Sequence, residues 1–362
     1  MGKRTTDDGQ PTGPVSLKTL AAYLNLDPTT VSVVLNRVPG RSIPEATRER
    51  IRKAAIKFNY EPSFVARSLR NRRTMTIGIL VPVLADGYHA EVMTGIGDRL
   101  LEENYFYFIA HHRHRADLIE QYPRMLMSRG AEGLITIDTN LLGKPPLPVV
   151  AIAGHQRVSG VTNVFLDNHR AAELSLRHLY DLGHRTIAFM RGQPYSADSD
   201  ARWQGIVQVA QDLGLSIRPE ITIQLEKDLT SPELGYPLVK QLLTHHRSFT
   251  AVLSFNDIAA IGCIRALHDA GLRVPQDVSV VGFDDIKEAA FQTPSLTTIR
   301  QPLHQMGALA VQTLLEQLRP SGARECAQIA VEPELIVRES TGPARKKPAR
   351  KGHSSAQTAT SD

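Results

Sequence analysis

The sequence predicts an all-α helix-turn-helix head followed by an α/β body of two doubly wound parallel-sheet lobes. Three observations predict it. The 362 residues are too many for one small core. Residues 15–60 carry only helical patterns with short turns, whereas apolar strand-like runs alternate with amphipathic runs from Thr76 onward. Nine or more strands in about 260 residues favour two consecutive sheets over a single one.

Composition narrows the class of protein. Hydrophobic residues make up 42% of the chain. No apolar run reaches the roughly 18 residues needed to cross a bilayer. The polar N-terminus lacks the apolar segment of a secretory signal. Cys263 and Cys326 do not form a disulfide framework, which favours a reducing compartment. We therefore expect a globular cytoplasmic protein.

Charge is unevenly distributed along the chain. Residues 1–75 contain 14 Lys and Arg against 6 Asp and Glu, a net charge of +8. Residues 76–340 contain 23 against 30, a net charge of −7. A basic head on an acidic body indicates that the head alone binds a polyanion, although a solubilising surface bias would give the same numbers.

The head begins with two short helices. Ser16 is a good N-cap for a helix over Leu17–Leu24, and Asn25 tolerates the left-handed conformation of a tight turn. Asp27 is the expected N-cap of a second helix, Pro28–Asn36, whose first position suits proline. On that helix the pattern buries Val31, Val34 and Leu35 and exposes Thr29, Thr30, Ser32, Val33 and Asn36.

A third helix completes the head. Ser42 and Glu45 are spaced as a capping box, and the helical pattern continues through Arg48–Phe58. Two short helices with a brief turn and a supporting third form a helix-turn-helix, whose second helix enters the DNA major groove. A three-helix head could also serve protein contacts.

The body alternates strands and helices. The expected strands are Thr76–Val81, Tyr105–Ala110, Gly133–Ile137, Val149–Ile152, Val161–Leu166, Thr186–Met190, Ile221–Leu225, Ala251–Ser254 and Val278–Gly282. Amphipathic stretches between them include Glu91–Glu102, Arg170–Leu182, Arg202–Leu213, Pro232–Leu243 and Ile258–Ala270. Apolar strands separated by helices indicate parallel sheets covered on both faces, with a ligand cleft between the lobes.

Several motifs occur in the order of one known family. They are TVS and VLN in the second helix, NY-P, ARSL, LGHR, GLRVPQDVSVVGFDD and LTTIRQP. On these motifs the chain resembles the lactose/galactose repressor (LacI/GalR) family from its head to about Thr341. The resemblance implies a periplasmic-binding-protein-like body, crossings between the lobes near Leu166, Pro294 and Gly322, and a homodimer on pseudo-palindromic operator DNA.

The resemblance also implies a hinge helix at Ser63–Arg70. In the family, paired hinge helices enter the minor groove, and an apolar wedge unstacks the central base step. Leu69 matches the wedge position, with Ala66 one turn earlier; by pattern alone Leu69 is an ordinary packing leucine. The positive charges that contact the DNA phosphates around the hinge would come from Arg67, Arg70, Arg72 and Arg73.

The DNA-contacting set that we expect spans the head and the hinge. Its members are Ser16, Leu17, Pro28, Thr29, Thr30, Ser32, Val33, Asn36, Ala66 and Leu69. Val33 stands where the family commonly has an arginine, so a bidentate guanine contact is absent there. We expect Thr29 to hydrogen-bond a base edge and the operator sequence to differ from that of arginine-bearing relatives.

A second set matches the family's effector site. Arg202 matches the effector-binding arginine, Asn256 and Asp257 a helix-start pair, Asp284 the aspartate after the next strand, and Tyr88 an aromatic contact. Asp and Asn suit polyhydroxylated ligands such as sugars. Read without the family, Asn256 or Asp257 could simply cap a helix, and Arg202 could be a surface ion-pair member.

Some loops depart from the family. His89 is a weak candidate contact, Ala153 and His155 stand where relatives often carry an aspartate, and Leu229 replaces an aromatic residue. The histidines at 111, 112 and 114 invite a metal hypothesis. A solvated or effector-contacting loop is the preferred interpretation, because the flanking arginines repel a cation.

The expected organisation follows from these patterns. Residues 1–14 form a disordered arm, 15–61 the DNA-binding domain, 62–75 the hinge and 76–341 the effector domain, with a basic disordered tail at 342–362. Lobe one is expected at about 76–166 and 295–322, and lobe two at about 167–294 and 323–341. No catalytic motif or dinucleotide fingerprint is present; Gly95 and Gly97 lie in a helical pattern without the third glycine. We expect neither an enzyme nor a cofactor or metal.

Overall fold

The computed structural model describes residues 15–36, 42–60, 73–84, 87–143, 145–154, 158–227, 229–319 and 327–345. The chain divides into two compact units between Met75 and Thr76. The expected hinge helix, with Ala66 and Leu69, lies outside the described residues, and so does the expected N-terminal arm.

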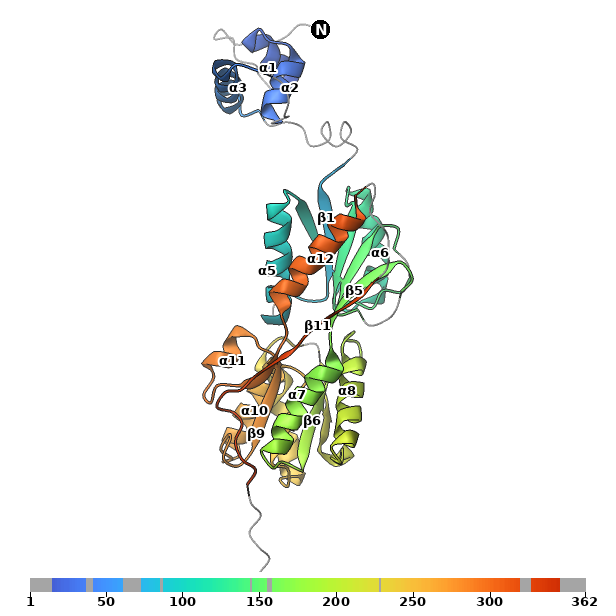
Figure 1. Cartoon of the computed structure of the whole chain (residues 1–362), viewed down its shortest axis with the longest axis vertical. Coiled ribbons are helices and arrows are strands. Elements are labelled where there is room, and N and C mark those ends of the chain that lie inside the picture. Colours follow the sequence, from blue (N-terminus) through green and yellow to red (C-terminus); the bar gives the residue numbers. More distant parts are fainter. Residues whose placement is uncertain are drawn as a thin grey trace, which may run out of the picture. The chain divides into compact units, whose positions relative to one another are not determined.

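The described residues of the first unit form three helices, labelled in Figure 1. They are α1 (Leu17–Leu24), α2 (Pro28–Leu35) and α3 (Glu45–Lys57). The Ser16 hydroxyl accepts a hydrogen bond from the Thr19 amide at 3.1 Å, and Asp27 accepts one from the Thr29 amide at 2.7 Å. Asn25 has a φ of 51° between the first two helices. The two predicted caps and the turn are therefore confirmed.

The capping box predicted at Ser42 is wrong. Helix α3 begins at Glu45, its N-cap is Pro44, and that cap makes no side-chain hydrogen bond. A proline disfavours the helical conformation of the residue before it, so a helix cannot readily start at Ile43. Glu45 pairs instead with Arg52, at 3.1 Å.

The head has its own small core, where all three helices meet. It is built from Leu20, Ala21, Leu24, Val31, Val34, Ile51, Ala54 and Ala55. Leu17 and Leu35 are only partly buried and pack against this cluster. Val31 and Val34, about one helical turn apart on the eight-residue α2, thus pack this helix against α1 and α3.

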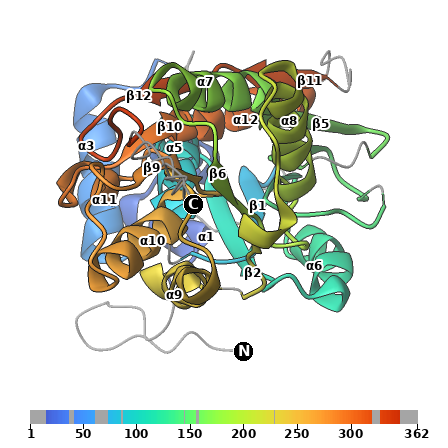
Figure 2. The same ribbon diagram turned by 90° about the horizontal axis from the view of Figure 1, so that it is seen from below.

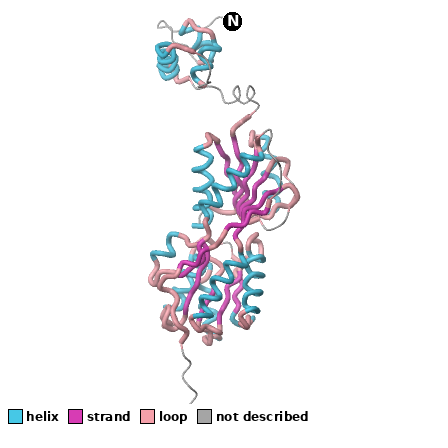
Figure 3. The backbone as a smooth tube through the Cα atoms, viewed as in Figure 1, coloured by secondary structure: helices cyan, strands magenta, loops and turns pink. Residues whose placement is uncertain are grey.

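In the second unit the described residues form two six-stranded sheets, each with helices on both faces (Figure 3). The first sheet has the order β11-β5-β4-β3-β1-β2. Its strands are β1 (Thr76–Val81), β2 (Phe106–His111), β3 (Gly133–Ile137), β4 (Val149–Ile152), β5 (Val161–Leu166) and β11 (Gln328–Val331). Its helices are α5 (Gly87–Glu102), α6 (Ala116–Ser128) and α12 (Leu303–Gln317).

The second sheet has the order β12-β10-β9-β8-β6-β7. Its strands are β6 (Ile187–Arg191), β7 (Thr222–Gln224), β8 (Ala251–Leu253), β9 (Ser279–Asp284), β10 (Thr297–Arg300) and β12 (Glu334–Ile336). Its helices are α7 (Asn168–Asp181), α8 (Ser199–Asp212), α9 (Tyr236–His245), α10 (Asp257–Asp269) and α11 (Lys287–Phe291), with short 3-10 turns at Pro219–Ile221 and Pro232–Leu234. Figure 2 shows α7 and α8 on one side of this sheet and α9 and α10 on the other.

The strands are parallel except where β10 pairs with β12. Every residue of β1, β3, β4 and β9 is buried, because helices cover both faces of these central strands. The predicted pair of doubly wound parallel sheets is confirmed.

Two of the three predicted lobe crossings are displaced. The first follows β5 near Leu166, as expected. The return lies between Arg300 and Leu303 rather than near Pro294, because β10 still pairs with β9 in the second sheet. The last crossing lies between Val331 and Glu334, since β11 pairs with β5 in the first sheet.

The predicted start of the disordered tail, at residue 342, is also wrong. The Gly342 amide donates to the Ser279 hydroxyl at 3.1 Å, and the Ala344 amide donates to the Leu182 carbonyl at 2.8 Å. His184 bonds the Gly342 carbonyl through Nε2 at 3.0 Å. The chain is therefore attached to the second lobe through these residues, and only the positions from 346 onward lie outside the described part.

Candidate functional site

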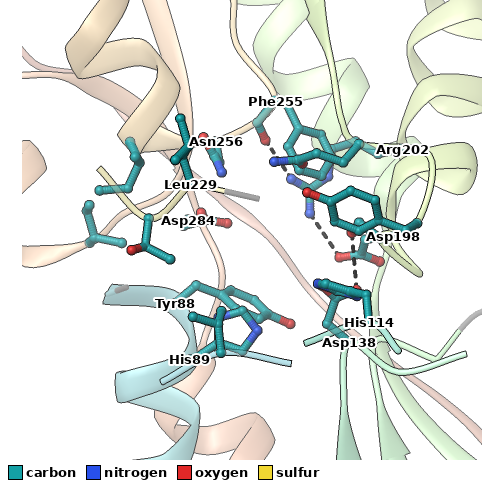
Figure 4. A pocket seen from close by; sticks show the side chains of 17 residues that line it. Tyr88, His89, His114, Asp138, Asp198, Arg202, Leu229, Phe255, Asn256 and Asp284 are labelled. Carbon is teal, nitrogen blue, oxygen red and sulfur yellow. Dashed lines mark hydrogen bonds and ion pairs between the residues drawn. The ribbon is translucent and has the colours of Figure 1, made fainter. Parts of the chain in front are cut away.

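A cleft lies between the two lobes, at the carboxyl ends of their strands (Figure 4). Segments that follow β1, β2, β3, β6, β8 and β9 contribute to it. The described lining residues are Val83, Tyr88, His89, His114, Asp138, Gln193, Tyr195, Ser196, Asp198, Arg202, Leu229, Thr230, Phe255, Asn256, Ile258, Asp284 and Ile286. This is where doubly wound sheets bind ligands.

Arg202 lies deep in the second-lobe wall, on α8, and is only 4% exposed. Its Nη1 donates to the Phe255 carbonyl at 2.6 Å, and its Nη2 donates to Asp198 at 2.9 Å. The guanidinium also stacks on Phe283, 3.6 Å from the ring centre. Its Nε is buried without a hydrogen-bond partner among the described residues. Arg202 is therefore a fixed element of the cleft, and the alternative of a surface ion pair is excluded.

Asn256 lines the cleft and caps α10 as well. Its Oδ1 accepts a hydrogen bond from the Ala259 amide at 2.9 Å. The cap fixes the side chain at the start of the helix, which leaves its amide nitrogen for other partners. The two interpretations of Asn256 thus hold together.

Asp257 is a correction to the expected effector set, because it does not line the cleft. Its carboxylate is fully buried and accepts hydrogen bonds from the Thr298 hydroxyl at 2.6 Å and the Ile286 amide at 3.0 Å. Asn256 and Asp257 are therefore neighbours in sequence that face different surroundings. Burial raises the pKa of Asp257 to about 7, although both hydrogen bonds lower it.

Asp284 ends β9 and reaches the cleft with a φ of 119°, in the left-handed region that non-glycine residues rarely adopt. Its Oδ1 accepts a hydrogen bond from the side-chain amide Nε2 of Gln301 at 2.7 Å. Gln301 is 4% exposed and follows β10, so the neighbouring strand positions this carboxylate.

Tyr88, near the start of α5, forms part of the first-lobe wall. Its hydroxyl is buried and has no hydrogen-bond partner among the described residues. Burial, and then the negative charges of Asp198, Asp138 and Asp284, raise the pKa of Tyr88 well above its ordinary value; Arg202 opposes them. His89 also lines the cleft, with its ring edge-on to Tyr88 at 5.0 Å.

Asp138, which was not predicted from the sequence, joins the lobes. It directly follows β3, and its Oδ1 accepts hydrogen bonds from the Ala197 amide at 2.7 Å and the Ser196 hydroxyl at 3.1 Å, both in the loop before α8. Burial, opposed by His89 and reinforced by Asp198, raises the pKa of Asp138. Its position after a predicted strand was a usable signal.

Asp198 and the pair His114 and Tyr195 were missed as well. Asp198 precedes Arg202 by one helical turn, an ion-pair spacing that the sequence displays. The rings of His114 and Tyr195 lie 4.4 Å apart, from opposite lobes, and no local pattern indicates such a contact. Leu229 lines the cleft, where the family pattern led us to expect an altered wall.

In the histidine run, both ring nitrogens of His112 take part in hydrogen bonds. The buried His112 ring accepts the His114 amide at Nδ1, 3.1 Å away, so its Nε2 carries the proton and donates to Thr139 at 2.9 Å. Burial, followed by the neighbouring histidines, lowers the pKa of His112 to about 3, which keeps the ring neutral. Across the described residues, no group of three or more His, Cys, Asp or Glu could hold a metal ion.

Fewer of the predicted DNA-contacting side chains of the head are exposed to solvent than expected. Ser16 and Thr29 are exposed, whereas Leu17, Pro28, Thr30 and Asn36 are half-buried. The predicted exposure of Ser32 and Val33 is wrong, since they are 9% and 7% exposed. The Asn36 amide covers Ser32 by donating to its carbonyl at 2.7 Å and its hydroxyl at 3.2 Å. The side of α2 opposite Val31 is thus also covered.

Comparisons with known proteins agree with this architecture. Residues 176–341 match the periplasmic binding protein-like domain. The chain is 30% identical over 337 residues to the HTH-type transcriptional repressor PurR of Haemophilus influenzae, covering 90% of this chain and 98% of that relative.

Solved structures give the same result. The Lac repressor dimer bound to operator and the anti-inducer ONPF superposes with a TM-score of 0.79 and 26% identity, covering 91% of this chain and 100% of that one. A LacI family regulator from Enterococcus faecium with bound ribose has a TM-score of 0.66 and 27% identity, covering 75% of this chain and 100% of that one.

Proposed function

Because the chain belongs to the LacI family of HTH-type transcriptional regulators, we propose that it is a repressor whose head binds operator DNA and whose cleft binds the controlling small molecule. Two copies bind one pseudo-palindromic operator, with α2 of each head in the major groove. The curated relatives are regulators rather than enzymes, and we propose the same for this chain, acting in the cytoplasm. No described helix is long and apolar enough to cross a membrane.

The observation that supports the proposal is the polar cleft between the two lobes of the body. Arg202, Asn256 and Asp284 line it from the second lobe, and Tyr88 and Asp138 from the first. A ligand that touches both walls binds one lobe arrangement more tightly than another. That difference in affinity is what a small molecule needs to shift the arrangement.

The DNA half of the proposal predicts specific contacts. Thr29, exposed at the start of α2, is proposed to contact a base edge, and Ser16 a phosphate. The hinge residues Ala66 and Leu69 are proposed to enter the minor groove of the same operator. Ser32 and Val33 are buried, so either can contact a base only after the residues that cover this side of α2 have moved away.

Selection of genomic fragments by the full-length protein tests DNA binding. We expect enrichment of a two-fold symmetric site, and weaker binding to it by Thr29→Ala but not by Thr244→Ala, an exposed threonine of the body. The loss of one hydrogen bond from the Thr29 hydroxyl to a base should cost about 0.5–1.5 kcal/mol of binding free energy. Equal affinity for enriched and random DNA would contradict the proposal.

The effector half is tested through Arg202. Metabolite fractions that change operator affinity should lose this effect with Arg202→Lys, which keeps a positive charge beside Asp198 but loses the planar fork and the stacking. Arg265→Ala is the control, since this arginine is exposed on α10, outside the lining of the cleft, and forms a surface ion pair with Asp269 at 2.9 Å. An unchanged response of Arg202→Lys would remove Arg202 from the effector site.

A further inference from the structure

Helix α2 contains no charged side chain and no side-chain amide. Its sequence from Pro28 to Leu35 is PTTVSVVL. In the major groove, arginine or lysine makes the two-bond contact to guanine, asparagine or glutamine the two-bond contact to adenine, and a carboxylate accepts from cytosine. None of these residue types occurs between Pro28 and Leu35, so this helix cannot make any of these contacts.

Asn36, the C-cap of α2, does not replace the missing contacts. Its amide nitrogen donates to the Ser32 carbonyl at 2.7 Å and to the Ser32 hydroxyl at 3.2 Å. Its Oδ1 is buried and has no hydrogen-bond partner among the described residues. A two-bond contact to adenine needs the nitrogen and the oxygen of one amide together, so the amide of Asn36 is not free to make it.

The first turn of α2 is the part that solvent reaches. Thr29 is exposed and Pro28 and Thr30 are half-buried, whereas the residues from Val31 to Val34 are buried. Asp27 holds this turn in place, because its carboxylate accepts the Thr29 amide at 2.7 Å. The N-terminal side chains of the second helix of a helix-turn-helix are those that lie at base edges. Here they offer the methylene groups of a proline ring and the methyl and hydroxyl groups of two threonines.

Apolar groups can distinguish one base from the others in the major groove. Thymine alone carries a methyl group there, whereas a threonine hydroxyl can bond the edges of several bases. The Pro28 ring has no N–H to donate, so its contacts are apolar. The apolar content of the first turn therefore selects thymine, and the threonine hydroxyls add hydrogen bonds that select less.

We propose that each operator half-site presents thymine methyl groups to the first turn of α2, and that these methyl groups, rather than guanine edges, determine which bases this helix selects. This inference rests on the proposed function. The methyl group of Thr29 contacts one thymine methyl, and the Pro28 ring covers the same methyl or that of a neighbouring thymine. The pairs that α2 reads are therefore A·T pairs with the thymine on a fixed strand.

Replacement of thymine by uracil tests the proposal, because it removes the methyl group and keeps every hydrogen-bonding group of the base. The operator enriched by the full-length protein is synthesised with one symmetric pair of thymines at a time replaced by uracil, and its affinity is measured at constant salt. Burial of one methyl group changes affinity about fourfold. We therefore expect binding to weaken about tenfold or more when both half-sites lose the contacted methyl group.

Variants of Thr29 assign the methyl contact. Thr29→Ser keeps the hydroxyl and loses the methyl group, so the effect of uracil should fall below about twofold, whereas Thr29→Val keeps a methyl group and should retain the effect. Pro28→Ala is the second variant, for a thymine that the proline ring covers. Thr244→Ser, at an exposed threonine of α9, is the control and should retain the full effect of uracil.

Two results would overturn the proposal: no pair of thymines responds to uracil, or every response is the same in the wild type, Thr29→Ser and Pro28→Ala. A preferred two-fold symmetric site that tolerates uracil at every position refutes the methyl contact and leaves the repressor assignment in place. Absence of any preferred site refutes the repressor assignment, and this inference with it.

Discussion

Removal of Asp138 should loosen the contact between the lobes. Its Oδ1 holds the Ala197 amide at 2.7 Å and the Ser196 hydroxyl at 3.1 Å, so one carboxylate of the first lobe bonds a loop of the second. Hydrogen bonds to a charged group contribute about 1.5–3 kcal/mol each, and water replaces part of that on opening. We estimate that Asp138→Ala weakens the joined arrangement by about 2–4 kcal/mol.

Hydrogen exchange of the Ala197 amide measures this effect directly, because the amide exchanges only when the bond to Asp138 opens. An energy of 2–4 kcal/mol corresponds to an exchange rate about 30- to 1000-fold faster in Asp138→Ala. Asp138→Asn keeps a neutral acceptor and should give a smaller acceleration. The Leu213 amide, bonded to the Val209 carbonyl at 3.0 Å at the far end of α8, is the internal control.

The result that would refute this reasoning is an unchanged Ala197 exchange rate in Asp138→Ala. Faster exchange of both Ala197 and Leu213 would also refute it, since that pattern means general loosening of α8. Only a local acceleration supports Asp138 as the contact that joins the lobes.

Three further predictions concern stability and DNA binding. Burial raises the pKa of Asp257 to about 7, whereas the carboxyl of the unfolded chain titrates near 3.8. The folded state should therefore lose stability as the pH rises between these values, by on the order of 4 kcal/mol at most. Urea denaturation measures this pH dependence, and Asp257→Asn should make it smaller. Gly95→Ala should lower the free energy of unfolding by about 1–3 kcal/mol, because its Cβ would lie 2.0 Å from a backbone carbonyl of α12, whereas Gly97→Ala on the same helix should be neutral or stabilising by up to about 1 kcal/mol; equal costs would contradict the packing argument. Leu69→Ala should weaken operator binding strongly in a gel-shift assay and leave effector affinity nearly unchanged, and an unaltered operator affinity would remove the wedge assignment.

Much of the fold could be predicted because burial on both faces gives parallel strands continuous apolar runs. Strand β1 and helix α1 have the bounds that the sequence predicts. The missed strands are β10, β11 and β12. Strand β11 alternates exposed and half-buried residues and β12 has three residues, so these two strands are defined by their pairing with β5 and β10 rather than by local hydrophobicity.

The two glycines Gly95 and Gly97 of α5 can be located in the sequence, but their structural role cannot be predicted from it. Gly95 and Gly97 resembled an incomplete phosphate-binding motif. In the structure, Gly95 allows the backbone of α12 to approach α5, whereas a Cβ on Gly97 would meet only the Tyr107 hydroxyl at 3.3 Å. A close helix–helix contact depends on a segment some two hundred residues away, which no local pattern indicates.

The candidate site shows the same limit at the level of charge. Arg202 could be expected to bind a carboxylate, because the sequence does not show that Asp198 and the Phe255 carbonyl already occupy its fork. Likewise, Asp138 and Asp284 are almost 150 residues apart in sequence, and only the joining of the two lobes brings both to Tyr88.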